Sequence, residues 1–256
     1  YKRSQTTVFI IIAILIVAGI TGTYVVIEQK KTQESKEFFS SSEIQPSLKN
    51  VESQILKCSE ETSRNSLEKI GVQGGYFNKP EYYFDLKTNF IPYYYYEGLI
   101  LQPSKQKIES ELSGYIDNNL DNCLNKINFP NFNLEYSLPI TRTSIKKSEV
   151  NFLTNLSSEI KHSKDSVNFE LSKHPLTLKS LLYEIIEVSE YITNSHKESP
   201  SIMCINCISE LAKERNLYVD FIAIEDDTTL VMLLENKTME EPYIFEFMNK
   251  YVKEIQ

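Results

Sequence analysis

The sequence predicts an α+β fold in which a long N-terminal hydrophobic helix is followed by an ectodomain of amphipathic helices and antiparallel strands. Three observations lead to this class. Residues 6–27 carry no charge, later segments repeat apolar residues every three or four positions, and others alternate apolar with polar residues. The second pattern is typical of amphipathic helices and the third of half-buried strands. Because the two patterns occur in separate runs, we expect α+β rather than βαβ.

The first element is the uncharged run of residues 6–27, which directly follows Lys2 and Arg3. With a rise of about 1.5 Å per residue, such a helix is roughly 33 Å long and can cross a hydrocarbon core of about 30 Å. We expect a single-pass membrane anchor. A cleaved secretory signal fits less well, because its apolar region is usually about 7–15 residues long. A pilin-like stem that packs with copies of itself in a filament is the third interpretation. The residues that we assign to the anchor are Val8, Phe9, Ile12, Leu15, Ile16 and Ile20.

The anchor and linker occupy residues 1–42, and the α+β ectodomain occupies residues 43–256. The length allows either one large domain or two subdomains at 43–130 and 131–256. The basic residues before the anchor favour a cytoplasmic N-terminus and an exterior C-terminal domain.

The charge distribution bears on the partners of this protein. The chain has a net charge of −8 and its first 31 residues carry +3, so the remainder carries −11. An acidic domain disfavours nucleic acid as a partner, because phosphate binding needs concentrated Lys and Arg. We therefore expect the chain to contact membrane lipid only through its N-terminal helix. We also expect it to associate with further copies of itself or with other surface proteins.

The first half of the ectodomain predicts two helices separated by strands. Apolar residues at helical spacing cover 48–70 and 104–127, the latter with Ser104 as the N-cap. Residues 82–84 and 91–101 are typical of strands.

The second half predicts strands, then two helices, then strands again. A hairpin turn is expected near residues 164–165. Helices are expected over 176–194 and over 199–216, where Ser199 and Pro200 resemble a cap and first turn. The expected strands lie at 134–138, 150–153, 167–171, 218–224, 229–234 and 243–248.

Four cysteines are candidates for disulfide bonds. Cys58 and Cys123 lie on two separate amphipathic segments, as a disulfide between neighbouring helices requires, and an exterior domain would permit that bond. Two buried free thiols are the alternative. Cys204 and Cys207 have C-x-x-C spacing, but thioredoxin-like chemistry needs its reactive thiol at a helix N-terminus that follows a strand. Here the first cysteine is expected about one turn beyond Pro200, which favours a structural disulfide.

A run of four tyrosines is the most unusual local feature. On a strand, alternate tyrosines face opposite sides, so two can enter the core while two form a surface strip. Tyrosine is enriched at interfaces because it offers contact area at low entropic cost. The candidates for an adhesive or subunit-contact patch are Tyr76, Tyr93, Tyr94, Tyr95 and Tyr96.

The N-terminus resembles the class III signal sequences of archaeal type IV pilins and related surface proteins. The resemblance rests on Lys2, Arg3, Ser4 and Gln5, followed by an Ile- and Val-rich helix. In that family the cut would follow Ser4, and a Glu that registers subunits would stand where this chain has Phe9. We expect the chain to keep its basic leader and to stay permanently anchored.

A second resemblance covers most of the chain and concerns uncharacterised membrane-anchored proteins of small-genome archaea. It rests on the anchor, two Cys-bearing helices, an aromatic strand and the motif Gly-Val-Gln-Gly-Gly-Tyr at residues 71–76. This resemblance implies a surface location and no particular activity.

Two classes of function follow from these observations. The first is a non-catalytic, membrane-anchored cell-surface protein with a structural or adhesive role, able to assemble through its N-terminal helix as a pilin-like subunit. The alternative is a membrane-tethered enzyme or solute-binding module whose site combines residues scattered in sequence. The sequence has no nucleophile elbow, phosphate loop or dinucleotide fingerprint, which favours the first class. We expect no catalytic residues, no cofactor and no metal.

Overall fold

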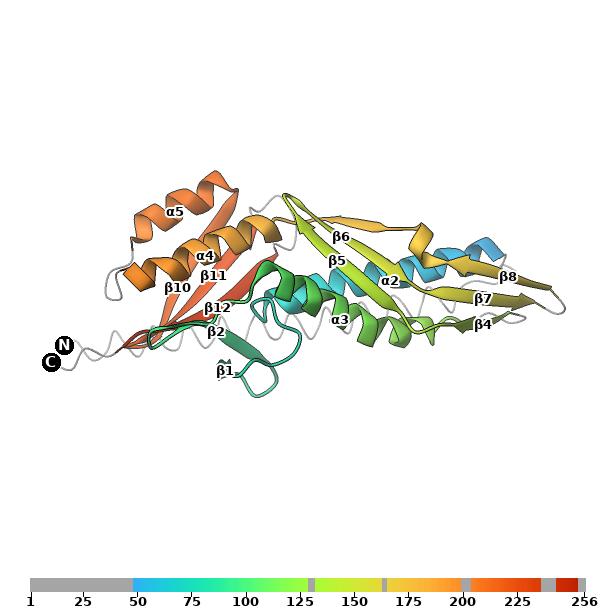
Figure 1. Cartoon of the computed structure of the whole chain (residues 1–256), viewed down its shortest axis with the longest axis horizontal. Helices are drawn as coiled ribbons and strands as arrows, with labels where there is room; N and C mark the ends of the chain where they lie inside the picture. Colours follow the sequence, from blue (N-terminus) through green and yellow to red (C-terminus); the bar gives the residue numbers. More distant parts are fainter. Residues whose placement is uncertain (1–47, 129–131, 163–164, 199–203, 236–242, 253–256) are drawn as a thin grey trace, which may run out of the picture. The chain divides into compact units, whose positions relative to one another are not determined.

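A computed structural model describes five stretches of the chain: residues 48–128, 132–162, 165–198, 204–235 and 243–252. The expected anchor lies outside the described residues. The chain divides after Ser47, and the unit Leu48–Gln256 contains every described element. This unit is a mixed α+β fold whose described residues form four α-helices and largely antiparallel sheets (Figure 1), which confirms the predicted class. No helix in these stretches is both long and apolar enough to cross a membrane.

Two long helices, α2 (Leu48–Gly71) and α3 (Lys105–Leu124), pack against each other as the periodicity predicts. At the start of α3 the Ser104 hydroxyl accepts a hydrogen bond from the backbone N–H of Lys107, which satisfies one of the free donors of the first turn. Cys58 and Cys123 form a disulfide between the two helices, with Cα atoms 5.6 Å apart. The disulfide predicted for this pair is confirmed.

Helix α3 also covers one edge of strand β5 (Ile140–Lys146), a strand that the sequence did not predict. The backbone N–H groups of three alternate residues of β5 donate to side chains four positions apart on α3. These pairs are Ile145 with Glu109, Thr143 with Ser113 and Thr141 with Asp117, at distances of 2.9, 3.1 and 2.8 Å. The spacings match because four helical residues rise about 6 Å and two strand residues about 6.6 Å. The helix thereby satisfies donors that an open edge would expose.

Two three-stranded antiparallel sheets lie in the middle of the sequence. One contains β4 (Asn133–Tyr136), β7 (Ser157–His162) and β8 (Asp165–Glu170). Strands β7 and β8 pair as a hairpin at the predicted position, although β7 itself was not predicted. The other contains β5, β6 (Glu149–Asn155) and β9 (Leu176–Lys179).

Strand β9 corrects the helix that was expected over residues 176–194. Leu176 to Lys179 pair with β6, and helix α4 (Leu182–Glu198) begins only afterwards. The break follows from local hydrogen bonds, because the Ser180 hydroxyl accepts from the N–H of Leu182 and a carboxylate oxygen of Glu235 accepts from the N–H of Leu181. These acceptors cap a new helix rather than continue an existing one.

The remaining strands form a six-stranded sheet. Its members are β1 (Tyr83–Asp85), β2 (Phe90–Tyr96), β3 (Leu99–Ile100), β10 (Leu217–Glu225), β11 (Thr228–Glu235) and β12 (Ile244–Lys250). Strand β2 pairs with β12 in parallel, which joins the segments 43–130 and 131–256 in one sheet. Helices α4 and α5 (Ile205–Glu214) lie on one face of this sheet (Figure 1). Helix α5 starts later than the expected Ser199, since Cys204 is its N-cap.

Gly74 in the turn after α2 requires both its positive φ of 52° and its lack of a side chain. A Cβ there would lie 2.5 Å from the carbonyl oxygen of Glu246 and 2.5 Å from the ring of Pro92. We expect Gly74→Ala to lower the free energy of unfolding in urea by roughly 2 kcal/mol, because strained backbone and steric overlap add.

Gly114 in helix α3 provides the control for this prediction. Nothing lies within 4 Å of a Cβ built on it, so Gly114→Ala should raise the free energy of unfolding by about 1 kcal/mol through helix propensity. A Gly74→Ala variant as stable as the native chain would contradict the steric explanation.

Candidate functional site

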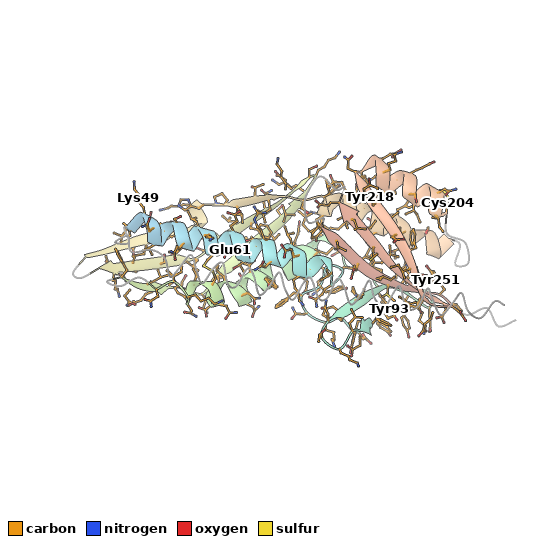
Figure 2. The ribbon with its side chains drawn as sticks, turned by 180° about the vertical axis from the view of Figure 1, so that it is seen from behind. Lys49, Glu61, Tyr93, Cys204, Tyr218 and Tyr251 are labelled. Atoms are coloured by element: carbon orange, nitrogen blue, oxygen red, sulfur yellow. A yellow bond between two sulfur atoms is a disulfide. The ribbon has the colours of Figure 1, made fainter. Side chains whose placement is uncertain are left out.

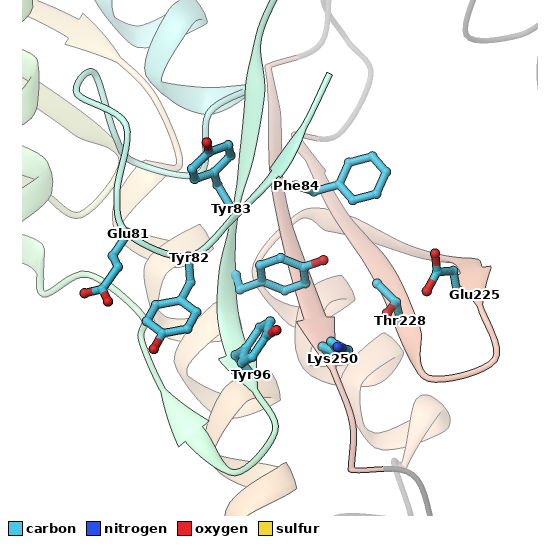
Figure 3. Close-up of a pocket in the computed structure, with 9 residues that line it drawn as sticks. Glu81, Tyr82, Tyr83, Phe84, Tyr96, Glu225, Thr228 and Lys250 are labelled. Carbon is cyan, nitrogen blue, oxygen red and sulfur yellow. The ribbon is translucent and has the colours of Figure 1, made fainter. Parts of the chain in front are cut away.

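A pocket of about 290 Å³ opens beside strand β2, and we call it the tyrosine pocket (Figure 3). Its aromatic lining consists of Tyr82, Tyr83, Phe84, Tyr93 and Tyr96. Its polar lining consists of Glu81, Glu225, Thr228 and Lys250. The pocket therefore combines β1 and β2 with the ends of three strands from the C-terminal part of the chain.

A β-bulge decides which tyrosines of β2 reach the pocket. Tyr93 pairs with Met248, and Tyr95 pairs with the next residue of β12, Asn249. Tyr94 is therefore an extra residue in β2 that has no partner position on β12. Such a bulge breaks the alternation of side chains. Tyr93 and Tyr96 consequently line the same pocket, with ring centroids 5.1 Å apart in an edge-to-face arrangement. Simple alternation had placed them on opposite faces.

The other two tyrosines of the run belong to the core. Tyr94 and Tyr95 are only 1% and 3% exposed, so neither side chain is accessible to a partner. The Tyr94 ring stacks on Phe247 with centroids 4.2 Å apart, and its hydroxyl donates to the carbonyl of Gly74 at 2.9 Å. Tyr76 is partly buried, with its hydroxyl 3.5 Å from the carbonyl oxygen of Leu101, and does not line the pocket.

Tyr96 is the centre of the aromatic cluster. The ring of Tyr82 lies 5.0 Å from it, and the ammonium of Lys250 lies 5.0 Å from its centroid. The same ammonium contacts a carboxylate oxygen of Glu97 at 2.6 Å. This hydrogen bond raises the pKa of Lys250, so the side chain is a stable cation. An ammonium is therefore already held against a tyrosine face at the pocket.

The environment of Tyr93 favours its neutral phenol. Burial raises the pKa of its hydroxyl, and the nearby carboxylates Glu225 and Asp227 raise it further, although Lys250 opposes them. The phenol thus remains a hydrogen-bond donor at neutral pH. Glu81 and Glu225 form no ion pair with any residue that the structure describes, which leaves negative charge at the pocket wall.

The sequence analysis identified only some of the residues that line this pocket. Tyr93 and Tyr96 were predicted as interaction residues, while residues 82–84 were predicted only as a strand. Because residues 82–84 precede the tyrosine run by a short turn, an antiparallel pairing of the two strands could have been expected, and it would have placed these residues near the tyrosines. Lys250 and Thr228 had no local signal, because their position depends on the pairing of β12 with β2 and β11.

Comparisons of this chain with protein families, with curated proteins and with solved structures find no match. Aromatic faces attract cations through the ring quadrupole at distances up to about 6 Å, and unpaired carboxylates add to that attraction. Among the described residues there is no group of three or more His, Cys, Asp or Glu side chains placed to hold a metal ion.

Proposed function

We propose that this chain is a membrane-anchored cell-surface protein with an adhesive role, and that its tyrosine pocket receives a cationic side chain of a partner protein. The observation that carries the proposal is the ammonium of Lys250 against the ring of Tyr96, in a pocket that the carboxylate of Glu225 also lines. The chain's own cation occupies one aromatic face in the way that a partner's cation would occupy another.

Charge and size both favour such an occupant. The carboxylates of Glu81, Glu97 and Glu225 outnumber the two ammonium groups around the pocket, those of Lys250 and of Lys79, whose nitrogen lies 4.2 Å from the ring centroid of Tyr83. The volume of about 290 Å³ lies just below the range of roughly 300–1,000 Å³ that is typical of small-molecule sites. One Lys or Arg side chain fits that volume better than a large solute does.

Location is the second part of the proposal. The uncharged run of residues 6–27 supports a single-pass anchor, with the N-terminus cytoplasmic and the folded unit exterior. Two disulfides, Cys58–Cys123 and Cys204–Cys207, support an exterior position, because oxidising compartments let such bonds persist. Assembly of several copies through the anchor is part of the same proposal and is independent of the pocket.

The pocket can be tested with two probes that differ in charge. Titrating the full chain in detergent with Nα-acetyl-arginine amide should give saturable binding, and the neutral citrulline analogue should bind at least about fivefold more weakly. Tyr93→Ala and Glu225→Gln should each weaken arginine binding by roughly threefold to fivefold, because each removes about 0.5–1 kcal/mol of attraction. Chemical shift changes or calorimetry would provide the measurement.

Glu190→Gln provides a matched control, since Glu190 is an exposed carboxylate of α4 that does not line the pocket. It should leave the affinity unchanged. Equal affinity for arginine and citrulline would overturn the proposal of a cation site. A small quaternary ammonium that binds more tightly than the arginine probe would favour the solute-binding module instead.

A further inference from the structure

Helix α5 begins with a disulfide between Cys204 and Cys207 (Figure 2). Cys204 is the N-cap residue, and its sulfur accepts a hydrogen bond from the backbone N–H of Cys207 at 3.3 Å. The start of a helix presents free N–H donors and the positive end of the helix dipole. A thiolate on Cys204 would therefore be stabilised where it forms, and this position meets the requirement for a helix N-terminus that the sequence analysis had set.

The two disulfides of this chain differ in their surroundings. Cys58 is 2% exposed, and its bond to Cys123 closes a span of 65 residues between two helices. Cys204 and Cys207 are both exposed and only three positions apart. By the loop-entropy relation, so short a span gives less than half the stabilisation of the longer one.

Other contacts already hold α5 in place. Ile208 and Ala212 are buried at 0% and 1% exposure, and the guanidinium of Arg215 just after the helix contacts Glu187 of α4 at 3.2 Å. These contacts hold the helix through residues other than the two cysteines. The exposed disulfide therefore does not join distant parts of the fold, whereas Cys58–Cys123 does.

We propose that Cys204 and Cys207 form a thiol–disulfide exchange centre that acts on cysteine pairs of other proteins. The accessible sulfurs, the C-x-x-C spacing and the helix N-terminus are the features that make cysteines reactive. Ile205, between the cysteines and 52% exposed, offers an apolar contact to an approaching peptide. This activity does not depend on the tyrosine pocket.

The exchange is balanced in two steps. A thiolate of a substrate dithiol attacks the sulfur of Cys204, the bond to Cys207 breaks, and Cys207 leaves as a thiolate that takes up a proton. The second substrate thiolate then attacks the substrate sulfur of the mixed disulfide and releases Cys204 as a thiolate at the helix N-terminus. The substrate dithiol loses two electrons to the pair and two protons, of which Cys207 takes up one and solvent the other while Cys204 remains a thiolate; a protein disulfide reacts in the reverse direction.

Single-cysteine variants of the full chain test this inference. Cys207→Ser leaves the N-cap thiol, and Cys204→Ser leaves the other exposed thiol as a matched control. At pH 7 the N-cap thiol should react with iodoacetamide roughly fivefold faster, since its larger thiolate fraction outweighs its lower nucleophilicity. After incubation with a peptide disulfide, Cys207→Ser should also accumulate a mixed disulfide, visible as an added mass on the intact protein.

Equal alkylation rates in the two variants would overturn the inference, and so would the absence of a mixed disulfide in Cys207→Ser. Either result would assign the pair a purely structural role. The Cys58–Cys123 bond is an internal reference, because it should stay intact under the mild reduction that opens Cys204–Cys207. Reduction of both bonds at the same rate would likewise contradict a specialised centre.

Discussion

Replacing Cys58 and Cys123 together by alanine is expected to lower the free energy of unfolding by about 4 kcal/mol. The reason is the span of 65 residues between them, since a cross-link over a long span removes much of the entropy of the unfolded chain. For a unit of this size, a loss of that magnitude lowers the melting temperature by about 10 °C. Thermal unfolding followed by circular dichroism would measure the change.

The second disulfide provides the comparison for this experiment. Replacing Cys204 and Cys207 by alanine should cost less than half as much, because the bond spans only three positions. Equal losses from the two double variants would show that span length does not govern the stabilisation here. A negligible loss on removing Cys58–Cys123 would mean that the packing of α2 on α3 suffices without the bond.

Helices α2 and α3 and the disulfide between them could be predicted because their signals are local. The apolar spacing in α2 and α3 places one stripe of each helix in the core, and Cys58 and Cys123 belong to those stripes. Two stripes that bury against each other bring their cysteines together without further information. The α+β class followed from the same periodicities.

What could not be predicted depends on partners distant in sequence. Leu176 to Lys179 become strand β9 only because β6 is available to pair with them. Tyr93 and Tyr96 share a pocket only because β12 pairs in parallel with a register shift. Neither event has a signature in the segment that it changes, so local alternation gave the wrong pairing of tyrosines.

The start of α5 illustrates how one boundary changes a functional argument. With a helix expected from Ser199, the first cysteine would have been inside a helical turn, where its sulfur gains nothing from the helix end. The structure makes Cys204 the cap itself. Sequence patterns locate the start of a helix only to within about one turn. The chemistry of Cys204 and Cys207 depends on that turn.

Raising the pH from about 4.5 to about 7 is expected to destabilise the fold through Glu246. This residue lies on β12 opposite Met232, and burial raises the pKa of its carboxyl to about 7 from the ordinary 4.5. The unfolded chain therefore releases this proton at a lower pH than the folded chain does. Since stability falls with pH wherever the folded state binds more protons, this carboxyl should cost about 3 kcal/mol once the pH exceeds 7.

Glu246→Gln should accordingly flatten the pH dependence between pH 4.5 and 7, and should make the fold more stable than the native chain at pH 8. Glu111 is the control of opposite sign. Burial tends to raise its pKa, but hydrogen bonds from Lys107, Asn78 and Phe77 outweigh that effect and lower it. Its contribution is complete above about pH 4.5, so Glu111→Gln should shift the urea stability curve between pH 5.5 and 8 without changing its slope. A Glu246→Gln variant with the native slope would show that Glu246 is solvated in the fold, because only a desolvated carboxylate carries this pH-dependent cost.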